Sequence, residues 1–444
     1  MAINLLSNKD PPTFKRGHLF AITMAFRDHL KEAEIIASVN PINEMRLTIE
    51  EYPNAALLFL SVDGTKGHKA AANVCLRDNL ARHFDIEPSK LLDALESAMH
   101  DRIDPIEIHS SAPVMENVID PVDLTQLPIP HHYPQDRGRY MSASIVIAER
   151  NGQRNVSFHR QFVRDKNHVV ARLVPRHLRT MVNEARAEGE CVNIAIVNGA
   201  DPCLLLAAAM SFNQPIDELT VASALYQRFY GKPLEVIKLE NGVTVPADAE
   251  YAMSATITLE DDDEGPYIDI TGTIDEVRKE PVIEIHSLHH RNEPIFHAIL
   301  PGLAEHHALM GLPRAPTIKS SVSKVCECTD VVMTSGGSGW LSAVVQIVPS
   351  SPDDARNAIM AAFQGHPSMK AVTVVDVDID PADPIRVEWA LMTRWQPDRD
   401  TIILSNQKGS SLDPTRADDG LTSKIGYDAT IPFGRDKKPF TSVL

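Results

Sequence analysis

The amino-acid sequence predicts a multidomain protein of mixed α+β and α/β class. At about 150 residues per domain, a chain of 444 residues has room for about three domains. The middle of the chain is rich in strand-like runs, whereas helical and strand-like stretches alternate before and after it. We therefore expect domains at residues 1–105, 106–310 and 311–444.

The first segment combines helices with a short strand and leads into a proline-rich stretch. Apolar residues at intervals of three and four predict a helix at residues 89–100, and we expect another helix at 25–36. The apolar run at 55–62 indicates a strand. Prolines crowd residues 121–134, which favours an extended linker.

Predicted strands dominate the middle segment. We expect them at residues 142–148, 192–197, 235–239, 252–259, 267–274 and 281–288. Helical patterns interrupt these strands at residues 177–187, 202–210 and 218–230. Antiparallel strands with inserted helices are typical of an α+β barrel or sandwich.

The last segment returns to alternating elements. Strand-like runs at residues 344–348, 371–380 and 385–392 accompany a helix at 354–363. The tail from residue 406 is rich in Gly, Ser, Asp and Pro, so we expect ordered coil there.

The charge balance excludes some classes of partner. The chain carries 43 Lys+Arg against 60 Asp+Glu, a formal net charge of −17, and it has no basic stripe. Nucleic acids and anionic membranes both attract clustered basic residues, so we expect neither as a partner. An acidic total still permits a small anionic substrate in a locally basic pocket.

Cysteine usage and the apolar runs indicate the cellular compartment. Five cysteines show no disulfide framework, and the first residues contain no apolar signal core. Cys326 and Cys328 lack the second Cys/His pair that a zinc site needs. Because no apolar run is long enough to span a membrane, we expect a soluble, cytoplasmic protein.

The stretch Asn155–Arg160 is the first candidate for a functional site. It follows a hairpin turn predicted at Asn151-Gly152. On a strand, Asn155, Ser157 and His159 would share one face, and Arg160 would lie on the other. An exposed polar strand with an ion-pairing arginine explains the same pattern without any chemistry.

Further candidates lie at the predicted ends of elements. His177 begins a helix, and Glu218 lies in a first helical turn, where a carboxylate also interacts favourably with the helix dipole. Glu264 and Asp269 flank a Gly-Pro turn, after the run Asp261–Asp263 that we expect to be a solvated loop. Two carboxylates that converge on one cavity can make a proton donor, because burial and like charge raise one pKa.

Histidines cluster late in the middle segment. Six of the 18 histidines fall between residues 286 and 307, but they form no HxH or HExxH pattern. One or two substrate-facing histidines are therefore favoured over a metal cluster.

Short segments along the chain, taken together and in order, carry a family resemblance. They include NVSFHR, VPRHL, DELTVASAL, EGPYIDITG, LHHRNEPIFHAILPG and HPSMKAVTVVDVDID. They resemble the UbiD family of prenylated-flavin-dependent decarboxylases over residues 105 to 430 or so. Within that family the chain is most similar to members that act on furan-2,5-dicarboxylate or anhydromevalonate phosphate.

The resemblance implies a fold and a set of cofactors. A central split β-barrel of the flavin-reductase type would hold prenylated FMN, between an N-terminal α/β domain and a C-terminal α/β domain that forms a dimer. A flavin prenyltransferase would supply the cofactor, which a potassium ion and a divalent metal (Mn²⁺ or Mg²⁺) accompany. The family's cofactor-binding and metal-binding positions fall on Asn155, Ser157, His177, Glu218 and Lys370, with Asn155, His177 and Glu218 as the metal ligands.

The family's catalytic trio falls on Arg160, Glu264 and Asp269. The resemblance implies that Arg160 orients the substrate carboxylate and pairs with Glu264, and that Asp269 protonates the carbon that loses CO2. His297 is the expected substrate contact. We therefore expect a homodimer or larger homo-oligomer that reversibly decarboxylates a small α,β-unsaturated or (hetero)aromatic carboxylic acid.

One departure from the family pattern keeps two alternatives open. Ile268 stands where the family usually has glycine, and a β-branched residue does not easily take a positive φ. The chain could therefore be a non-catalytic or regulatory flavin-binding relative. From the residues alone, a metal-dependent hydrolase using Glu264 and Asp269 is the other alternative.

Overall fold

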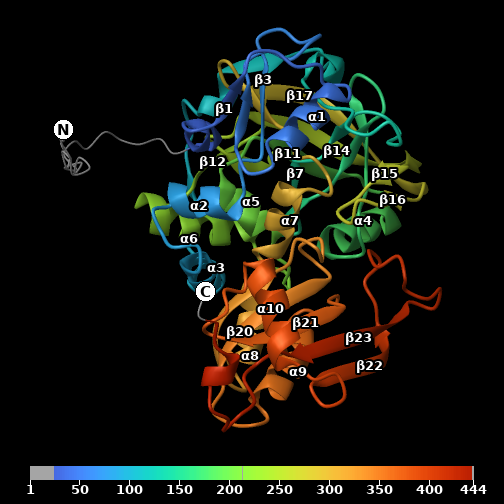
Figure 1. Ribbon diagram of the computed structural model, residues 1–444. Coiled ribbons are helices and arrows are strands. Elements are labelled where there is room, and N and C mark those ends of the chain that lie inside the picture. The colour runs from blue at the N-terminus through green and yellow to red at the C-terminus, as the bar shows by residue number, and fades with distance from the viewer. Residues whose placement is uncertain (1–24, 213, 443–444) are drawn as a thin grey trace, which may run out of the picture.

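Three larger β-sheets organise the chain. The computed structural model describes residues 25–212 and 214–442, and the larger sheets within it have four, nine and five strands. In Figure 1 the five-stranded sheet lies below the other two, with α7 (Ala304–Gly311) between them. The expected mixed class with several sheets is confirmed, whereas the three domain boundaries stay predictions.

The four-stranded sheet joins the start of the chain to residues near 300. Its order is β1-β2-β3-β18. The strands are β1 (Glu34–Ile36), β2 (Leu57–Phe59), β3 (Lys69–Ala72) and β18 (Ile295–His297). The helix predicted at residues 25–36 is wrong. A 3₁₀ helix at Phe26–Leu30 is followed by β1, because residues 34–36 pair in parallel with β2.

The nine-stranded sheet forms the centre of the protein. Its order is β6-β9-β10-β17-β14-β11-β7-β8, and β5 pairs with β17. The strands are β5 (Asn117–Ile119), β6 (Tyr140–Met141), β7 (Ile145–Arg150), β8 (Gln153–Phe158), β9 (Gln161–Val163), β10 (His168–Ala171), β11 (Val192–Asn198), β14 (Tyr251–Glu264) and β17 (Arg278–His290). Among the described residues this order ends at β6 and β8, so no closed barrel forms and the split barrel stays a prediction.

The central sheet separates two hydrophobic cores. Val146 and Ile147 are neighbours on β7, and both are fully buried, but they belong to different cores. This follows from the period of two along a strand. Both faces of the sheet are therefore covered. Because side chains on both faces are buried, the central strands are continuous apolar runs in the sequence.

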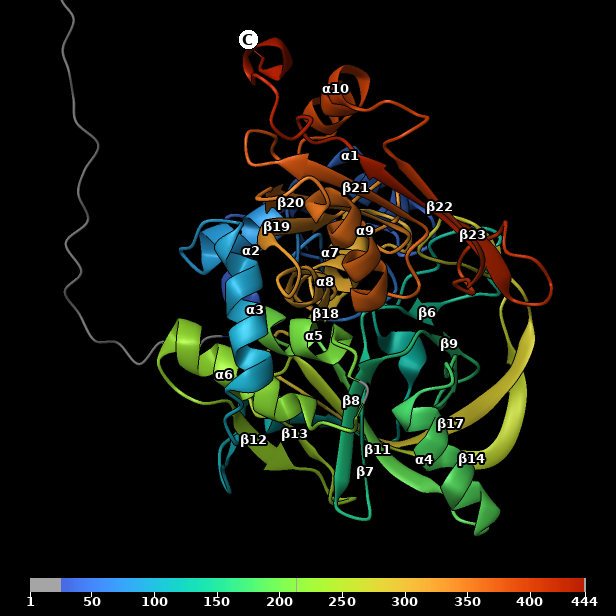
Figure 2. The same ribbon diagram turned by 90° about the horizontal axis from the view of Figure 1, so that it is seen from below.

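Helices cover the two faces of this sheet. Figure 2 shows α5 (Pro202–Ala209) and α6 (Glu218–Tyr230) on one side of β8 and α4 (His177–Ala187) on the other. All three helices were predicted, and α4 and α6 have the predicted bounds. Among the described residues before β18, the other helices are α1 (Glu44–Glu51), α2 (Arg77–His83), α3 (Lys90–His100), and the 3₁₀ turns Pro113–Met115 and Leu124–Gln126.

Two predictions around the acidic run are wrong. Asp261–Asp263 was expected to be a loop but continues β14, where these residues pair with β17. Lys279 on β17 forms an ion pair with Asp263, which offsets the local repulsion. The strand predicted at 267–274 is instead a small hairpin of β15 (Tyr267–Ile268) and β16 (Ile274–Asp275). A second small sheet contains β4 (Ile106–Glu107), β12 (Glu235–Lys238) and β13 (Thr244–Pro246).

The C-terminal sheet has the order β19-β20-β21-β23-β22. Its strands are β19 (Glu327–Met333), β20 (Ser342–Val348), β21 (Ala371–Asp376), β22 (Thr401–Lys408) and β23 (Leu421–Asp428). Its helices are α8 (Ala315–Val322), α9 (Asp354–Gly365), α10 (Pro384–Arg394) and a 3₁₀ turn at Lys438–Phe440.

Two predictions for this sheet are wrong. The strand predicted at 385–392 is helix α10. The Asp383 side chain accepts hydrogen bonds from the Ile385 and Arg386 amides, and Pro384 occupies the first turn, so the helix start is well specified. The tail from residue 406 is only partly coil, because β22 and β23 pair across residues 401–428.

None of the helices in the described ranges combines the length and apolarity that crossing a membrane requires. The chain start, where no signal core was found, lies outside the described residues.

Gly339 sets how closely the chain before β20 approaches α7. Its φ is +61°, and a Cβ there would lie 2.4 Å from the His307 carbonyl oxygen. We expect Gly339→Ala to lower the free energy of unfolding by about 1–3 kcal/mol, because the backbone strain and the clash add. Urea unfolding measures this loss. In the control Gly336→Ala nothing lies within 4 Å of the new Cβ, so its change should stay below about 0.5 kcal/mol. Equal losses in both variants would contradict the packing role.

Candidate active site

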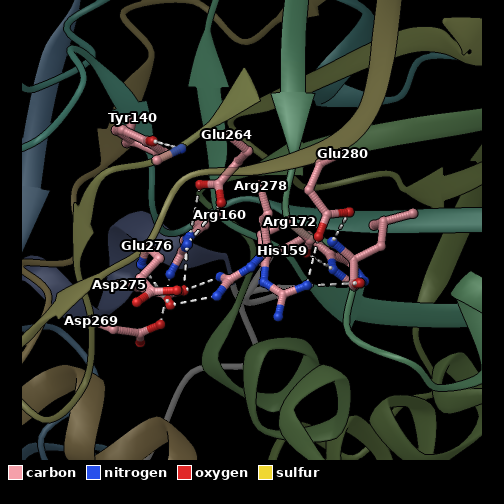
Figure 3. A network of polar contacts seen from close by, with 12 residues as sticks. Tyr140, His159, Arg160, Arg172, Glu264, Asp269, Asp275, Glu276, Arg278 and Glu280 are labelled. Carbon is pink, nitrogen blue, oxygen red and sulfur yellow. Dashed lines mark hydrogen bonds and ion pairs between the residues drawn. The ribbon is translucent and has the colours of Figure 1, made fainter. Parts of the chain in front are cut away.

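Arg160 is the centre of a buried charge cluster. Its Nε and Nη2 donate to the two oxygens of Glu264, at 2.9 and 2.7 Å. Nη1 donates to Asp269 Oδ2 at 2.7 Å, and Nη2 also donates to Asp275 Oδ2 at 2.8 Å. Figure 3 shows the three carboxylates converging on this one guanidinium. The structure therefore brings the predicted trio Arg160, Glu264 and Asp269 together.

Four elements position these side chains. Arg160 lies in the short connection between β8 and β9, and Glu264 is the last residue of β14. Asp269 follows β15 directly, and Asp275 ends β16. Because β15 and β16 form a hairpin, the carboxylates of Asp269 and Asp275 both lie next to the Arg160 guanidinium. Asp275 also binds Arg278, with 2.5 Å between its Oδ2 and Arg278 Nη1.

Ile268 does not disturb this loop. It lies on β15, paired with Ile274, and its amide donates to Asp136 Oδ1 at 2.8 Å. The extended backbone accepts a β-branched residue readily. The positive φ is at Gly265 instead, where a Cβ would lie 2.9 Å from the Glu276 carbonyl oxygen. Ile268 therefore gives no reason to expect an altered shape in the loop that holds Asp269.

Burial and pairing set the electrostatics of Arg160. The Glu264 side chain has no exposed surface and the Arg160 side chain retains 8%. Burial opposes the charge of Arg160, but the hydrogen bonds to Glu264 and the neighbouring carboxylates outweigh it and raise the pKa of Arg160. Burial likewise opposes the charge of Asp275, yet Arg278 and Arg160 bring its pKa down to about 2. Arg160 and Asp275 are therefore both ionised at neutral pH.

Arg160 has one N–H group that donates to no carboxylate of the cluster. A guanidinium has five N–H groups, and four donate to Glu264, Asp269 and Asp275. One Nη1 proton is left for an incoming carboxylate. Tyr267 lies against the guanidinium, with the Arg160 Cζ 4.6 Å from the ring centroid, and restricts its movement.

The polar face predicted on residues 155–159 is confirmed. Ser157 Oγ lies 2.9 Å from Asn155 Oδ1 and 3.0 Å from His159 Nε2. His159 Nδ1 donates to the Arg172 carbonyl at 2.9 Å, which makes Nε2 an acceptor. Burial lowers the pKa of His159 to about 4, so the ring is neutral at physiological pH. The serine hydroxyl has one proton and can satisfy only one of its two neighbours.

The expected metal ligands lie near one another. Asn155 Nδ2 donates to Glu218 Oε1 at 3.3 Å, and the Val156 amide donates to Glu218 Oε2 at 2.8 Å. Asn155 and His177, the first residue of α4, line the same cavity of about 190 Å³. No cluster of three His, Cys, Asp or Glu side chains suited to a metal occurs among the described residues, but the expected set contains an asparagine.

The donor chemistry of this site fits a cation. Glu218 is 3% exposed, and no described cation forms an ion pair with it. Burial raises the pKa of Glu218 to about 8, because no positive charge compensates its carboxylate. A divalent ion on Glu218, His177 and Asn155 Oδ1 would supply that charge and leave the Ser157 proton for His159. The set therefore suits the metal that the resemblance implies.

Two predicted residues lie apart from these clusters. Lys370 Nζ binds Asp413 Oδ1 at 3.0 Å and Thr415 Oγ1, at the start of β21. His297 has no exposed surface, and its Nε2 lies 2.9 Å from Glu305 Oε1. A role of Lys370 in phosphate binding and of His297 in substrate binding both stay predictions.

Several residues of the site were missed by sequence reasoning. Asp275 and Arg278 complete the Arg160 cluster, and His306 on α7 accepts a hydrogen bond from the Gly302 amide at 3.2 Å. Burial dominates at His306 and lowers its pKa to about 4, against the opposing effect of Asp269. No spacing rule finds Asp275, because only the β15–β16 hairpin returns it to Arg160.

Comparison with known families decides the identity of the chain. Residues 107–304 match the 3-octaprenyl-4-hydroxybenzoate carboxy-lyase Rift-related domain of the UbiD family. Residues 307–429 match the C-terminal domain of the same carboxy-lyases. The chain belongs to the UbiD family. It is a decarboxylase of that family, and the resemblance found in the sequence is confirmed.

Individual relatives of this UbiD-family decarboxylase support the same conclusion. It is 40% identical over 417 residues to the anhydromevalonate phosphate decarboxylase of Methanosarcina mazei, covering 92% of this chain and 96% of that protein. The UbiD-class enzyme HmfF from Pelotomaculum thermopropionicum, solved with FMN, matches at a TM-score of 0.90 and 32% identity, covering 95% and 97% of the two chains. An evolved dimeric form of HmfF, solved with prFMN, matches at a TM-score of 0.85 and 30% identity, covering 94% and 99%.

The bidentate pair between Arg160 and Glu264 can be tested directly. We expect Arg160→Lys to lower kcat/KM for decarboxylation by at least about 100-fold, because an ammonium cannot reproduce the planar fork that would align the substrate. CO2 release from the cofactor-loaded enzyme measures it. The control Arg164→Lys changes an arginine that pairs with Glu260, at 2.8 Å between Nη1 and Oε1, and should leave the rate nearly unchanged. Full activity in Arg160→Lys would remove the proposed role.

The Glu218 site can be tested without turnover. We expect Glu218→Gln to weaken Mn²⁺ binding at least about 10-fold, measured by calorimetry on the metal-free protein. The variant should melt no lower than wild type without metal, because the substitution removes an unpaired buried carboxylate. Glu184 lines the same cavity and is exposed, so Glu184→Gln is the matched control. Unchanged Mn²⁺ affinity in Glu218→Gln would refute the ligand assignment.

Proposed function

We propose that this UbiD-family decarboxylase releases CO2 from a small α,β-unsaturated or (hetero)aromatic carboxylic acid with the help of prenylated FMN. The observation that carries the proposal is the convergence of Glu264, Asp269 and Asp275 on Arg160, which leaves one guanidinium N–H for a substrate carboxylate. The HmfF structures with FMN and prFMN support a flavin as the cofactor.

The residues of the polar face would hold this cofactor. Asn155, His177 and Glu218 would bind a divalent metal that neutralises the cofactor phosphate, with Ser157 beside them and Lys370 contacting the phosphate from the C-terminal sheet. A potassium ion and a flavin prenyltransferase belong to the same proposal. When bound, the cofactor supplies an electron sink for the decarboxylation.

The protein's own residues would then position the substrate and move one proton. Glu264 holds Arg160 through two parallel hydrogen bonds, so the remaining Nη1 proton points in a fixed direction. The same Nη1 donates to Asp269 Oδ2 at 2.7 Å, and the Asp269 side chain is 23% exposed. It can therefore exchange protons with solvent and give one to the carbon that loses CO2. The reverse carboxylation would use the same groups in the opposite order.

The proposal also covers the barrel that holds the cofactor, the oligomeric state and the cellular location. We propose that the nine-stranded sheet is the split barrel that holds the cofactor, and that two or more copies of the chain associate, as in the dimeric form of HmfF. Light scattering on the purified protein measures that assembly. We also propose a cytoplasmic location, which is consistent with five cysteines that form no disulfide among the described residues.

Neither the metal-dependent hydrolase nor the non-catalytic flavin-binding relative is favoured by a specific observation. Membership of a carboxy-lyase family leaves the metal-dependent hydrolase without support. A non-catalytic flavin-binding relative was motivated by Ile268, and the strand geometry of that residue removes the motive.

The experiment that tests the function combines cofactor loading with one substitution. The protein is purified from cells that co-express a flavin prenyltransferase, its visible spectrum is recorded, and unsaturated, furan and aromatic acids are screened for CO2 release. Phosphorylated unsaturated acids belong in the screen, because the Methanosarcina mazei relative is named for one. A cofactor band without release of CO2 from any acid would favour the non-catalytic alternative, and a colourless protein would refute the proposal.

Asp269→Asn isolates the proton donor. We expect the variant to retain the cofactor band and to lose CO2 release by at least about 100-fold, because an amide cannot donate the proton. Asp263→Asn is the control, since Asp263 pairs with Lys279 on the exposed part of β14 and touches none of the site. Full activity in Asp269→Asn would assign the proton transfer to another group.

A further inference from the structure

Asp275 is shared between two arginines. Its Oδ2 accepts hydrogen bonds from Arg160 Nη2 at 2.8 Å and from Arg278 Nη1 at 2.5 Å. Its Oδ1 accepts from Arg278 Nη2 at 2.9 Å and from the Glu276 amide at 3.0 Å. In Figure 3 the dashed lines join this carboxylate to both guanidinium groups. Asp275 would therefore keep three of these four hydrogen bonds if it released Arg160.

Asp275 occupies the edge of Arg160 that lies away from the buried Glu264. Glu264 binds Nε and the Nη2 proton beside it, and its side chain has no exposed surface. Asp275 binds the other Nη2 proton, on the edge that Nη2 shares with Nη1, and its side chain is 25% exposed. Asp269 takes only one of the two Nη1 protons. Release of Asp275 would thus give an incoming carboxylate two N–H groups of Arg160 in place of one.

Both arginines are held in place, so only the Asp275 side chain has to move. Glu264 binds Arg160 through two hydrogen bonds, and Tyr267 lies against the same guanidinium, with its ring centroid 4.6 Å from Arg160 Cζ. Arg278 is the first residue of β17 and pairs with Glu264 in the β14–β17 ladder. Asp275 can therefore rotate away from Arg160 and remain on Arg278.

We propose that the substrate carboxylate displaces Asp275 from Arg160, and that Arg278 retains the displaced carboxylate. Asp275 is then a positioning residue, which holds the Nη2 proton of Arg160 until a second carboxylate replaces it. The exchange conserves charge, because one carboxylate leaves Arg160 as another arrives. It also restricts the ligand to ionised acids, since an ester or amide brings no charge to replace that of Asp275. The inference rests on the proposed decarboxylation and names the group that the substrate replaces.

The same contacts have a simpler interpretation, in which Asp275 and Arg278 only add charge to the surroundings of Arg160. Removing a negative charge near a site strengthens anion binding, and removing a positive charge weakens it, wherever the charges lie. In the exchange, by contrast, Arg278 acts on the ligand only through Asp275. Single and double variants together distinguish the two interpretations.

Binding of a carboxylate that does not react provides the test. Tetrahydrofuran-2-carboxylate has no double bond conjugated to its carboxylate, so it is titrated by calorimetry into the cofactor-loaded enzyme without turnover. We expect Asp275→Asn to lower its dissociation constant about 3- to 10-fold, because a neutral amide competes less well for Arg160 than a carboxylate does. We expect Arg278→Gln to raise it by about the same factor, because Asp275 then has no other cation. Asp263→Asn makes the same change of charge in an exposed ion pair and should bind like wild type.

The double variant Asp275→Asn/Arg278→Gln decides between the interpretations. If Arg278 acts through Asp275, the double variant should bind the acid as tightly as Asp275→Asn alone. Additive effects of the two substitutions would overturn the exchange in favour of a purely electrostatic influence. Absence of binding to both wild type and Asp275→Asn would also overturn it, because the released edge of Arg160 would then accept no carboxylate.

Two controls address a general change in structure. Arg278→Lys keeps a cation for Asp275 and should retain most of the wild-type affinity, whereas a loss equal to that of Arg278→Gln would contradict the exchange. The uncharged tetrahydrofuran-2-carboxamide cannot replace Asp275, so the substitutions should not change its binding; changes that parallel those of the acid would assign the effect to pocket shape. Asp275→Ser repeats the titrations if Asp275→Asn does not fold. Because no titration involves turnover, an enzyme that binds the acid as expected but releases no CO2 would refute the proposed function and not the exchange.

Discussion

The ion pair between Arg160 and Glu264 is the constraint on which the site depends. Both side chains are buried, and removing either one would leave the other as an uncompensated charge. Two parallel hydrogen bonds make the geometry rigid, and they join the β8–β9 connection to the end of β14. The hairpin β15–β16 then adds two further carboxylates to the same guanidinium. The position of every group proposed to touch the substrate carboxylate follows from this one pair.

The protein contains two kinds of buried charge, and the difference between them is informative. Arg160 is surrounded by acceptors, so its charge is satisfied within the chain. Glu218 and Arg314 are buried without an opposite charge among the described residues. Folding tolerates few such groups, because each costs desolvation free energy without a compensating partner. A ligand of opposite charge would stabilise a buried carboxylate or guanidinium that has no ion-pair partner. The net charge of −17 gives no hint of either.

Errors in the sequence-based prediction follow from competition between local and tertiary signals. Residues 385–392 have a strand-like pattern, but Asp383 and Pro384 provide a helix start that determines the structure. Asp261–Asp263 would be solvated in isolation, whereas pairing with β17 keeps them in a strand. The end of the helix expected at 25–36 is strand β1 for the same reason, since residues 34–36 pair with β2. By contrast, α4 and α6 agree with their predicted bounds, since α4 is strongly amphipathic and α6 begins at the capping side chain of Asp217 and ends at Gly231.

The sequence by itself determined the mixed class, the long central helices, the polar face from Asn155 to His159 and, through the ordered motifs, the family and the three residues proposed as its catalytic trio. These features depend on local periodicity or on short segments of chain. Only the tertiary structure decided that Asp275 completes the Arg160 cluster, that His297 pairs with Glu305, and that Arg314 is buried against Trp340 without an ion-pair partner among the described residues. Those contacts join residues that are distant along the chain. Whether a buried charge is satisfied depends on the neighbours that folding brings to it, and no local pattern contains that information.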